Sequence, residues 1–259
     1  MSCPKIAIGK ELSGCKNVIT LGMRPNFEDY TPQEQRLIYE AETIYFPTFF
    51  YAGLFKTMGK KTFPSYECYQ YACNKIKQTA LFKLLQIPHP KTRTFYGDRQ
   101  KRQILKYFKY PFIAKIPRGS ARGKGVFLIR NESELSTYNK MTHVAYIQEY
   151  FPLERDLRVV VIKNQVILAY WKVKKRGEYR CNVARGATIV FDDIPSEAID
   201  LALKVSQQCN LDNVGIDICF YNGRYYVLEA NMKYGLKAFA LAGIDYKKML
   251  SQMIEDGIL

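Results

Sequence analysis

The stretch NVGIDICFYNGRYYVLEANMKYG, residues 213–235, decides the predicted fold. It contains three side chains, Asp217, Glu229 and Asn231, that each offer an oxygen ligand. Two carboxylates held close together repel each other unless a cation lies between them, and hard oxygen donors suit Mg²⁺. The stretch therefore predicts a magnesium site, with a solvated hairpin face as the alternative interpretation.

Apolar and polar residues alternate on both sides of a short Asn-Gly-Arg connection in this stretch. The alternation predicts strands over 214–221 and 225–230, because successive side chains of a strand point to opposite faces. A two-residue turn would set Asp217 opposite Leu228, whereas a three-residue loop sets it opposite Glu229. We expect the three-residue loop, which puts both carboxylates on one face of the hairpin.

Length and composition limit the classes of protein to which the chain can belong. At 259 residues it can form one large domain or two to three packed subdomains. Hydrophobic residues make up 47% and aromatic residues 14%, which excludes wholesale disorder. The longest apolar runs are too short to cross a bilayer, and the first residues lack the apolar core of a secretion signal. We therefore expect a cytoplasmic protein with no membrane partner.

Cysteine usage and charge narrow the choice further. None of the seven cysteines forms a Cys-x-x-Cys pair, and the chain has only two histidines, which disfavours a zinc site. We therefore expect reduced thiols. A net charge of +15 attracts polyanions, among them nucleotides and acidic substrates, although a basic soluble surface is the plainer explanation. The lysines and arginines gather at 56–61, 99–102, 118–124 and 172–180.

Hydrophobic periodicity predicts helices interspersed with antiparallel strand pairs, an α+β arrangement rather than a doubly wound sheet. Strands are expected at 5–9, 17–21, 43–46, 92–95, 112–116, 125–130, 145–150, 156–162 and 165–173. Helices are expected at 32–41, 49–59, 74–86, 100–108, 132–140, 195–209 and 246–256.

A glycine-rich connection joins two of these strands and contains Gly119, Ser120, Gly123 and Gly125. Such residues let backbone N–H groups approach phosphate oxygens closely. Lys115, at the end of the preceding strand, can neutralise phosphate charge. The segment is neither a Walker nor a Rossmann loop, because it lacks Gly-Lys-Ser/Thr and no helix follows it. An ordinary turn is the alternative.

Another strand ends in Gln148, Glu149, Tyr150 and Phe151, polar residues followed by aromatic ones. The backbone of such an end can bond the edge of an adenine, and the two aromatic rings can flank the base. In isolation the same pattern fits an edge strand equally well.

Two further segments supply charge. Asp156 and Arg158 lie two residues apart and therefore share one face of a strand, where they could grip a ribose hydroxyl and an anion. Arg180, within 176–182, supplies a cation of the kind that a transferring phosphoryl group needs. A plain salt bridge and a solvated loop are the respective alternatives.

Taken together and in this order, the segments resemble the ATP-grasp superfamily, and most closely its ribosomal-protein glutamate-ligase branch, the RimK-like proteins. The resemblance covers about residues 44–235. Its matching elements are Asn74-Lys75 at the start of a helix, Lys115 before 119–126, 148–151, Asp156 with Arg158, Arg180 with Asn182, and 215–217 with 229–231.

The resemblance implies an ATP-grasp fold, in which two α+β subdomains clamp ATP, preceded by a short α/β N-terminal domain. The implied domains are residues 1–72 for the N-terminal domain and 73–259 for the ATP-grasp domain. Within the latter, 73–147 would be the lid and central subdomain with the glycine-rich loop, and 148–259 the C-terminal metal-binding subdomain.

The resemblance also implies ATP and Mg²⁺ as cofactors, with Mn²⁺ as a substitute metal. Carried over by position, the metal would be held by Asp217, Glu229 and Asn231. The nucleotide would be held by Lys75, Lys115, Gly119, Ser120, Gly123, Gly125, Gln148, Glu149, Tyr150, Phe151, Asp156 and Asn182. Arg158 and Arg180 would stabilise the phosphoryl oxygens and the tetrahedral intermediate.

The implied reaction is an ATP-dependent ligation of a carboxylate to an amine. The carboxylate attacks the γ-phosphate to give an acylphosphate, and the amine then displaces phosphate. The acceptor would be an acidic small molecule, peptide or protein tail, in keeping with the basic charge. An ATP-grasp small-molecule kinase is the alternative; a basic nucleic-acid-binding protein without catalysis is less favoured, and a homo-oligomer is left open.

Overall fold

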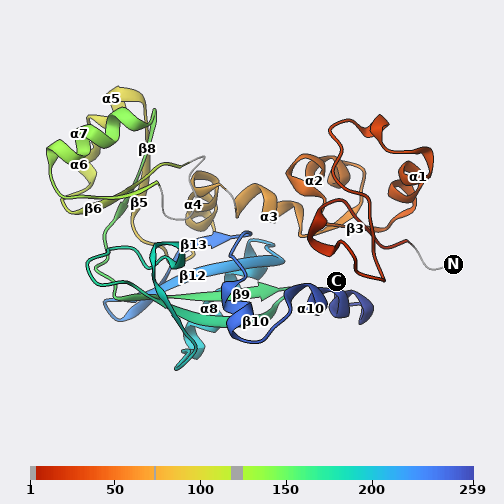
Figure 1. The fold of residues 1–259 in the computed structure, drawn as a ribbon. Helices are drawn as coiled ribbons and strands as arrows, with labels where there is room; N and C mark the ends of the chain where they lie inside the picture. The colour runs from red at the N-terminus through yellow and green to blue at the C-terminus, as the bar shows by residue number, and fades with distance from the viewer. Residues whose placement is uncertain (1–3, 73, 118–124) are drawn as a thin grey trace.

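The computed structural model describes residues 4–72, 74–117 and 125–259. Three β-sheets follow one another along the chain, as the colour gradient of Figure 1 shows. The first is entirely parallel, whereas every strand pair in the other two is antiparallel. The expected α+β arrangement is confirmed.

The first sheet has the strand order β2-β1-β3-β4. Its strands are β1 (Ile6–Ala7), β2 (Ile19–Thr20), β3 (Thr43–Tyr45) and β4 (Lys61–Phe63). The helical elements around it are η1 (Lys10–Leu12), η2 (Phe27–Asp29), α1 (Pro32–Glu40), α2 (Thr48–Thr57) and α3 (Tyr66–Tyr71). The sequence pattern did not predict β4 or α3.

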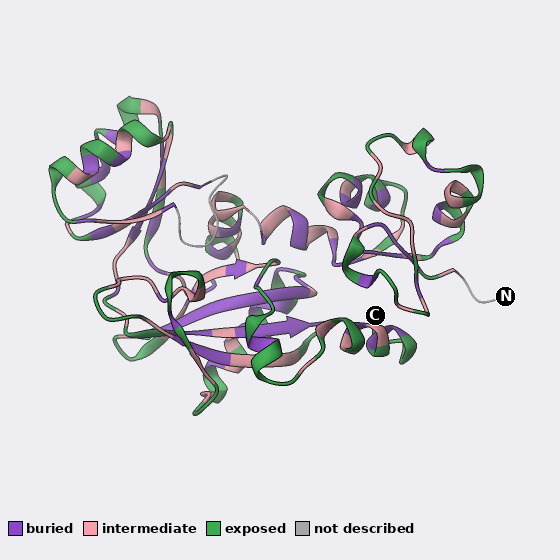
Figure 2. Ribbon diagram, in the orientation of Figure 1, coloured by how far each residue is buried: buried purple, intermediate pink, exposed green. Residues whose placement is uncertain are grey.

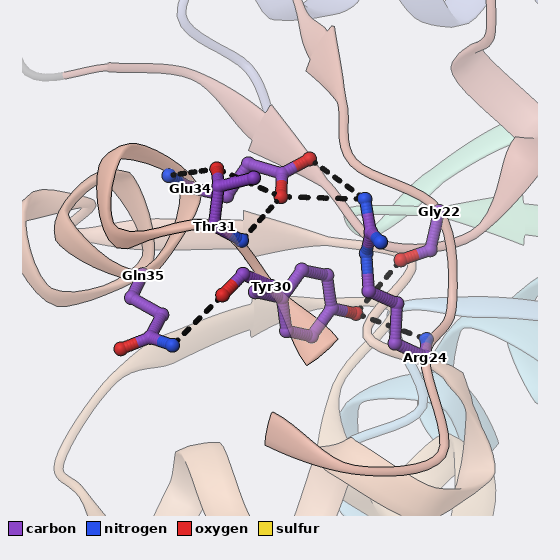
Figure 3. Close-up of polar contacts among 6 residues, drawn as sticks. All are labelled: Gly22, Arg24, Tyr30, Thr31, Glu34 and Gln35. Carbon is purple, nitrogen blue, oxygen red and sulfur yellow. Dashed lines mark hydrogen bonds and ion pairs between the residues drawn. The ribbon is translucent and has the colours of Figure 1, made fainter. Parts of the chain in front are cut away.

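The start of α1 is fixed by a local polar network (Figure 3). Thr31 accepts from the Glu34 backbone N–H while the Glu34 carboxylate accepts from that of Thr31, a reciprocal capping box. Glu34 also pairs with Arg24 at 3.1 Å. The buried Tyr30 donates its hydroxyl to the carbonyl of Gly22 at 2.7 Å. The network ties the loop before α1 to the helix.

The second sheet, which we call the lid sheet, has the order β5-β8-β6-β7. Its strands are β5 (Thr92–Tyr96), β6 (Phe112–Lys115), β7 (Val126–Ile129) and β8 (Val144–Glu149). The helices α5 (Gly97–Lys101), α6 (Ile104–Tyr107) and α7 (Glu132–Met141) gather on its outer side in Figure 1. Phe95, Ile104, Phe112 and Tyr138 belong to the core that joins these helices to the sheet.

The third sheet has the order β11-β10-β9-β12-β13. Its strands are β9 (Arg155–Ile162), β10 (Gln165–Val173), β11 (Thr188–Val190), β12 (Asn213–Tyr221) and β13 (Arg224–Asn231). The helices α4 (Lys75–Leu84) and α8 (Ser196–Gln208) pack on it and share its largest core. The central strands are buried, as the purple of Figure 2 shows.

The last helix, α10 (Tyr246–Glu255), follows the short α9 (Lys237–Leu241) and returns to the first sheet. Leu250, Met253 and Ile254 share a core with Ala7 and Leu12. Both ends of the described chain therefore lie in the part of the molecule that contains the first sheet (Figure 1). Among the helices that the structure describes, none combines the length and the apolar character needed to cross a bilayer.

Candidate functional site

The hairpin of β12 and β13 sets Asp217 opposite Glu229, which is the pairing that we expected. The expected three-residue loop is wrong, because Tyr221 pairs with Arg224 across a two-residue turn. A β-bulge between Asp217 and Ile218 supplies the extra residue instead, Leu228 on β13. The pairing of the two carboxylates is therefore right, although the extra residue lies in the strand rather than in the turn.

The geometry of the turn explains this difference. Asn222 and Gly223 have φ angles of 47° and 80°, so both adopt a left-handed backbone conformation. Two-residue hairpin turns require this conformation, which asparagine and glycine adopt more readily than other residues. The local sequence therefore favours the short turn, and the register is corrected further along the strand.

Four charged side chains meet in the middle of the third sheet: Asp156, Lys172 and Asp217, which are buried, and Arg158, which is half-buried. The Nε and Nη2 atoms of Arg158 donate to the two carboxylate oxygens of Asp217 at 2.5 and 2.6 Å. Lys172 Nζ lies 2.8 Å from Asp217 Oδ1 and 2.9 Å from Asp156 Oδ1. Strand register causes the contacts, because Arg158 is paired with Asp217, and Lys172 with Asp156.

The two carboxyl groups of this cluster respond differently to burial. Burial alone would raise the pKa of Asp217, but Arg158 and Lys172 outweigh it and hold that pKa below its usual value. Burial raises the pKa of Asp156, and Lys172 offsets only part of the rise. Asp217 is therefore the permanently charged carboxylate of the pair.

A second charged group surrounds Glu229. Lys75, the first residue of α4, places its Nζ 2.5 Å from Glu229 Oε1. Lys115, at the end of β6, is buried, with its Nζ 5.7 Å from the centre of the Tyr146 ring. Burial lowers the pKa of Lys115 to about 8, although the neighbouring Glu229 opposes that shift. The site thus presents lysines on one side of the carboxylate pair and the Arg158 cluster on the other.

The oxygen donors of this site fit Mg²⁺ or Mn²⁺. A carboxylate offers about four lone-pair positions, and the hydrogen bonds and ion pair of Asp217 occupy three of them. Glu229 is contacted by Lys75 through Oε1. Asn231, opposite Gly215 on β12, adds an amide oxygen. No three His, Cys, Asp or Glu side chains cluster within the described ranges, so a metal here would depend on two carboxylates and one amide.

The strand end at 148–151 lies where the lid sheet meets the third sheet. Gln148 is buried and donates to Thr92 Oγ1 at 3.1 Å. The Glu149 carboxylate accepts from the backbone N–H of Lys91. These two side chains are therefore engaged within the lid sheet, as is the backbone N–H of Glu149, which donates to the Lys91 carbonyl at 2.9 Å.

The two aromatic residues at this strand end differ in environment. Phe151 stacks on Tyr221 with ring centres 4.2 Å apart and also packs against Tyr226. Tyr150 is half-buried. Phe151 thus anchors the link between the two sheets to the end of β12.

The loop after β10 reaches across to the lid sheet. Tyr179 donates its hydroxyl to the carbonyl of Val126 at 2.7 Å, and Arg180 Nη1 lies 3.5 Å from the same oxygen. Arg180 is also paired with Glu178 at 2.7 Å. Asn182 accepts from the N–H of the second residue after it and caps η3 (Val183–Arg185). These contacts attach the loop to β7, the strand that follows the glycine-rich segment.

Most of the glycine-rich segment falls outside the described residues. Gly119, Ser120 and Gly123 belong to that part, so their expected role stays a prediction. Gly125 is described, and its carbonyl accepts from Ile116 N–H at 2.8 Å, next to the β6–β7 ladder.

Two residues of the site were missed from the sequence. Lys172 lay in the expected strand 165–173 but was counted only with the basic residues of 172–180, whereas it is buried between two carboxylates. The backbone carbonyl of Tyr234 accepts from Arg158 Nη1 at 3.0 Å. A Cβ on Gly215 would lie 2.6 Å from that of Tyr234, which explains the glycine. The apolar residues around Lys172 were the available signal for its burial.

Comparison with known families gives one clear match. The model of the RimK-like ATP-grasp domain matches residues 72–254 of this chain. That range contains all the site residues described above.

Comparison with curated proteins gives partial matches. The chain is 30% identical over 190 residues to the coenzyme gamma-F420-2:alpha-L-glutamate ligase of Methanococcus maripaludis, covering 70% of this chain and 66% of that protein. It is 30% identical over 162 residues to the human N-acetylaspartylglutamate synthase A, covering 59% of this chain and 41% of that protein. The chain thus spans less than two thirds of the length of these relatives.

Comparison with solved structures supports the fold. A RimK domain ATP-grasp protein from Sphaerobacter thermophilus matches with a TM-score of 0.70 at 12% identity, covering 96% of this chain and 98% of the other. The ATP complex of a D-alanine–D-alanine ligase from Bacillus anthracis matches with a TM-score of 0.71 at 14% identity, covering 97% and 96%. The shared fold includes the first sheet as well as the other two.

Proposed function

The chain belongs to the RimK-like ATP-grasp family, and from this premise we propose that it is an ATP- and Mg²⁺-dependent carboxylate–amine ligase. It would activate a carboxylate as an acylphosphate and transfer the acyl group to an amine, giving an amide and inorganic phosphate. The pairing of Asp217 with Glu229 between two sets of cations is the observation that supports this most strongly. Catalysis would rest on positioning and charge neutralisation.

The metal ligands in this proposal are Asp217, Glu229 and Asn231. When bound there, Mg²⁺ or Mn²⁺ would neutralise charge on the phosphate oxygens. Arg158 holds the carboxylate of Asp217 through two hydrogen bonds, so its first role is to orient that ligand. Lys172 supports the same carboxylate from β10.

The phosphate groups of ATP would be held by Lys75 and Lys115 beneath the glycine-rich loop. Both lysines lie beside Glu229, where a polyphosphate bound with its metal would add negative charge. Arg180 would stabilise the phosphoryl oxygens from the loop that contacts β7. Asn182, which caps η3, would fix the end of that loop.

Adenosine recognition would use the junction of the two sheets. The backbone of 148–150 would bond the edge of adenine, with Tyr150 and Phe151 at its sides. Asp156 would contact the ribose or neighbouring polar atoms, and its raised pKa lets it act as a hydrogen-bond donor as well as an acceptor.

The acceptor in this proposal is an acidic small molecule, peptide or protein tail. Glutamate appears in the names of several relatives, including the Methanococcus enzyme, and the net charge of +15 suits an acidic partner.

A cytoplasmic site of action is supported by free thiols at all five described cysteines. We keep the domain division 1–72, 73–147 and 148–259 as part of the proposal.

Product analysis tests the proposal. The protein would be incubated with Mg-ATP, glutamate and candidate acids or amines, and the mixture read by mass spectrometry and by phosphate release. A new amide formed with equimolar phosphate is expected, and the Glu229→Gln variant should form none. A phosphorylated small molecule without an amide would instead identify a kinase and overturn the ligase assignment.

A further inference from the structure

A groove at the β5 edge of the lid sheet shares only Glu149 with the site described above. Its volume is about 690 Å³, and it is lined by residues of α4, β5, α6 and the end of β8. Arg93 is paired with Ile147 on the sheet, whereas Lys115 is paired with Tyr146. Because neighbouring residues of a strand point to opposite faces, the Arg93 side of the groove and Lys115 lie on opposite faces of the lid sheet.

The groove is cationic and poorly compensated. Lys83, Lys91 and Arg93 line it together with one acidic residue, Glu149. Within the described residues, none of the three cations forms an ion pair with a carboxylate. The ammonium groups of Lys83 and Lys91 donate to backbone carbonyls at 2.6 and 2.7 Å, and the Glu149 carboxylate accepts from a backbone N–H. Several N–H donors therefore remain for a ligand.

The surrounding segment reinforces this charge. Residues 83–109 contain eight lysines and arginines against the single acidic residue Asp98, a net charge of +7. This segment of 27 residues therefore carries almost half of the +15 of the whole chain. A concave cationic surface of this kind concentrates anionic partners.

The aromatic side chains of the groove favour carboxylates over nucleic-acid bases. The Arg93 guanidinium lies 3.7 Å from the centre of the Tyr107 ring, which also packs against Phe95. Phe108 is only 5% exposed. Single-stranded nucleic acids need open aromatic faces for stacking, whereas Phe108 is covered and Arg93 lies over the ring of Tyr107, which is 36% exposed. A guanidinium held flat on a ring keeps the N–H donors at its edge, which match a carboxylate in pairs.

We propose that this groove binds an acidic peptide segment of the acceptor, at a distance from the reacting centre. The identification of the partner as the acceptor rests on the proposed ligase function, whereas the binding itself requires neither ATP nor turnover. Such a groove would hold a glutamate-rich chain while its end is presented on the other side of the lid.

Fluorescence anisotropy with a fluorescein-labelled octaglutamate peptide tests the proposal. The Lys91→Gln/Arg93→Gln variant should bind about tenfold more weakly than wild type, since two exposed charge contacts are removed. The matched control Lys247→Gln/Lys248→Gln removes the same charge from exposed positions on α10. Its affinity should stay within about twofold of wild type.

Three outcomes would overturn the proposal: no binding of octaglutamate, equal weakening in both double variants, or tighter binding of a labelled oligouridylate that depends on Lys91 and Arg93. If the groove variant does not fold, the variant Lys83→Gln, at an exposed position, is used in its place. We expect it to bind octaglutamate about threefold more weakly than wild type. Binding that persists in a protein without ligase activity would reject the proposed function and retain the groove. Ligase activity without peptide binding would retain the proposed function and reject the groove as a peptide site.

Discussion

Individual charged side chains in the site are controlled by two opposing effects, burial and neighbouring charge. Burial disfavours the charged form of any group, so it lowers the pKa of a lysine and raises that of a carboxyl group. Burial has the larger effect on the pKa of Lys115, whereas the positive charges of Arg158 and Lys172 together have the larger effect on the pKa of Asp217. Both pKa values therefore lie below their usual ranges, for opposite reasons: burial lowers that of Lys115, and neighbouring cations lower that of Asp217.

The pH dependence of ATP use follows from Lys115. Its pKa is lowered to about 8, so the positive charge that would face the phosphates is lost as the pH rises through that value. We expect kcat/KM for ATP, measured by phosphate release, to fall between about pH 7 and pH 9. The Lys115→Arg variant keeps its charge and should show no such fall. An identical decline in both proteins would exclude Lys115 as its cause.

The sequence predicted the positions of some charged side chains in the site but not of others. The spacing of Asp156 and Arg158 correctly placed both on one face, because two-residue periodicity holds in any strand. Lys172 was expected within the strand 165–173, but its charge was counted only as part of the basic run 172–180, so its burial was not predicted. Only the register of β10 against β9 shows that it faces Asp156.

Among the elements, the β12–β13 hairpin shows what pattern alone can establish. The alternation allowed Asp217 to lie opposite Leu228 or Glu229, and the pairing with Glu229 was expected from a three-residue loop. That pairing needs one residue more than a two-residue turn provides, but the pattern does not show where the extra residue lies. A three-residue loop and a two-residue turn with a bulge satisfy the same requirement. Local φ preferences at Asn222 and Gly223 decide between them.

The loop after β10 should couple nucleotide binding to the position of Arg180. The Tyr179 hydroxyl holds β7 through the Val126 carbonyl, and β7 follows the loop that would cover the phosphates. Tyr179→Phe removes this bond, which is worth about 1 kcal/mol, so KM for ATP should rise about fivefold. Steady-state kinetics with Tyr39→Phe, on the exposed side of α1, provide the control. An unchanged KM would show that the contact is incidental.

Across the whole molecule, the ends of the chain are joined in a way that no local pattern predicts. Lys5 donates its ammonium to the carbonyl of Ile254 at 2.7 Å, across 249 residues of sequence. The amphipathic pattern correctly predicted a helix at 246–256, but an apolar face does not identify its partner. The order of motifs, by contrast, did predict the ATP-grasp fold, because that order reflects the whole arrangement.

The contribution of the packing of α10 on the first sheet to stability can be measured at Ile254, which is fully buried between them. Ile254→Ala should lower the free energy of unfolding by about 3 kcal/mol, because it leaves a cavity in that core. Ile258→Ala makes the same change at a position that is 37% exposed, and should cost less than about 1 kcal/mol. Urea denaturation followed by circular dichroism distinguishes them, and equal losses would contradict the packing described here.

The central claim is that Asp217, Glu229 and Asn231 anchor a divalent cation beside the phosphates of ATP. Isothermal titration calorimetry of ATP binding, with and without Mg²⁺, tests it most directly in the wild type and in Glu229→Gln. We expect Mg²⁺ to strengthen ATP binding at least about tenfold in the wild type and this gain to disappear in the variant. Equal ATP affinity with and without Mg²⁺ in the wild type, or a variant that keeps the full gain, would contradict it.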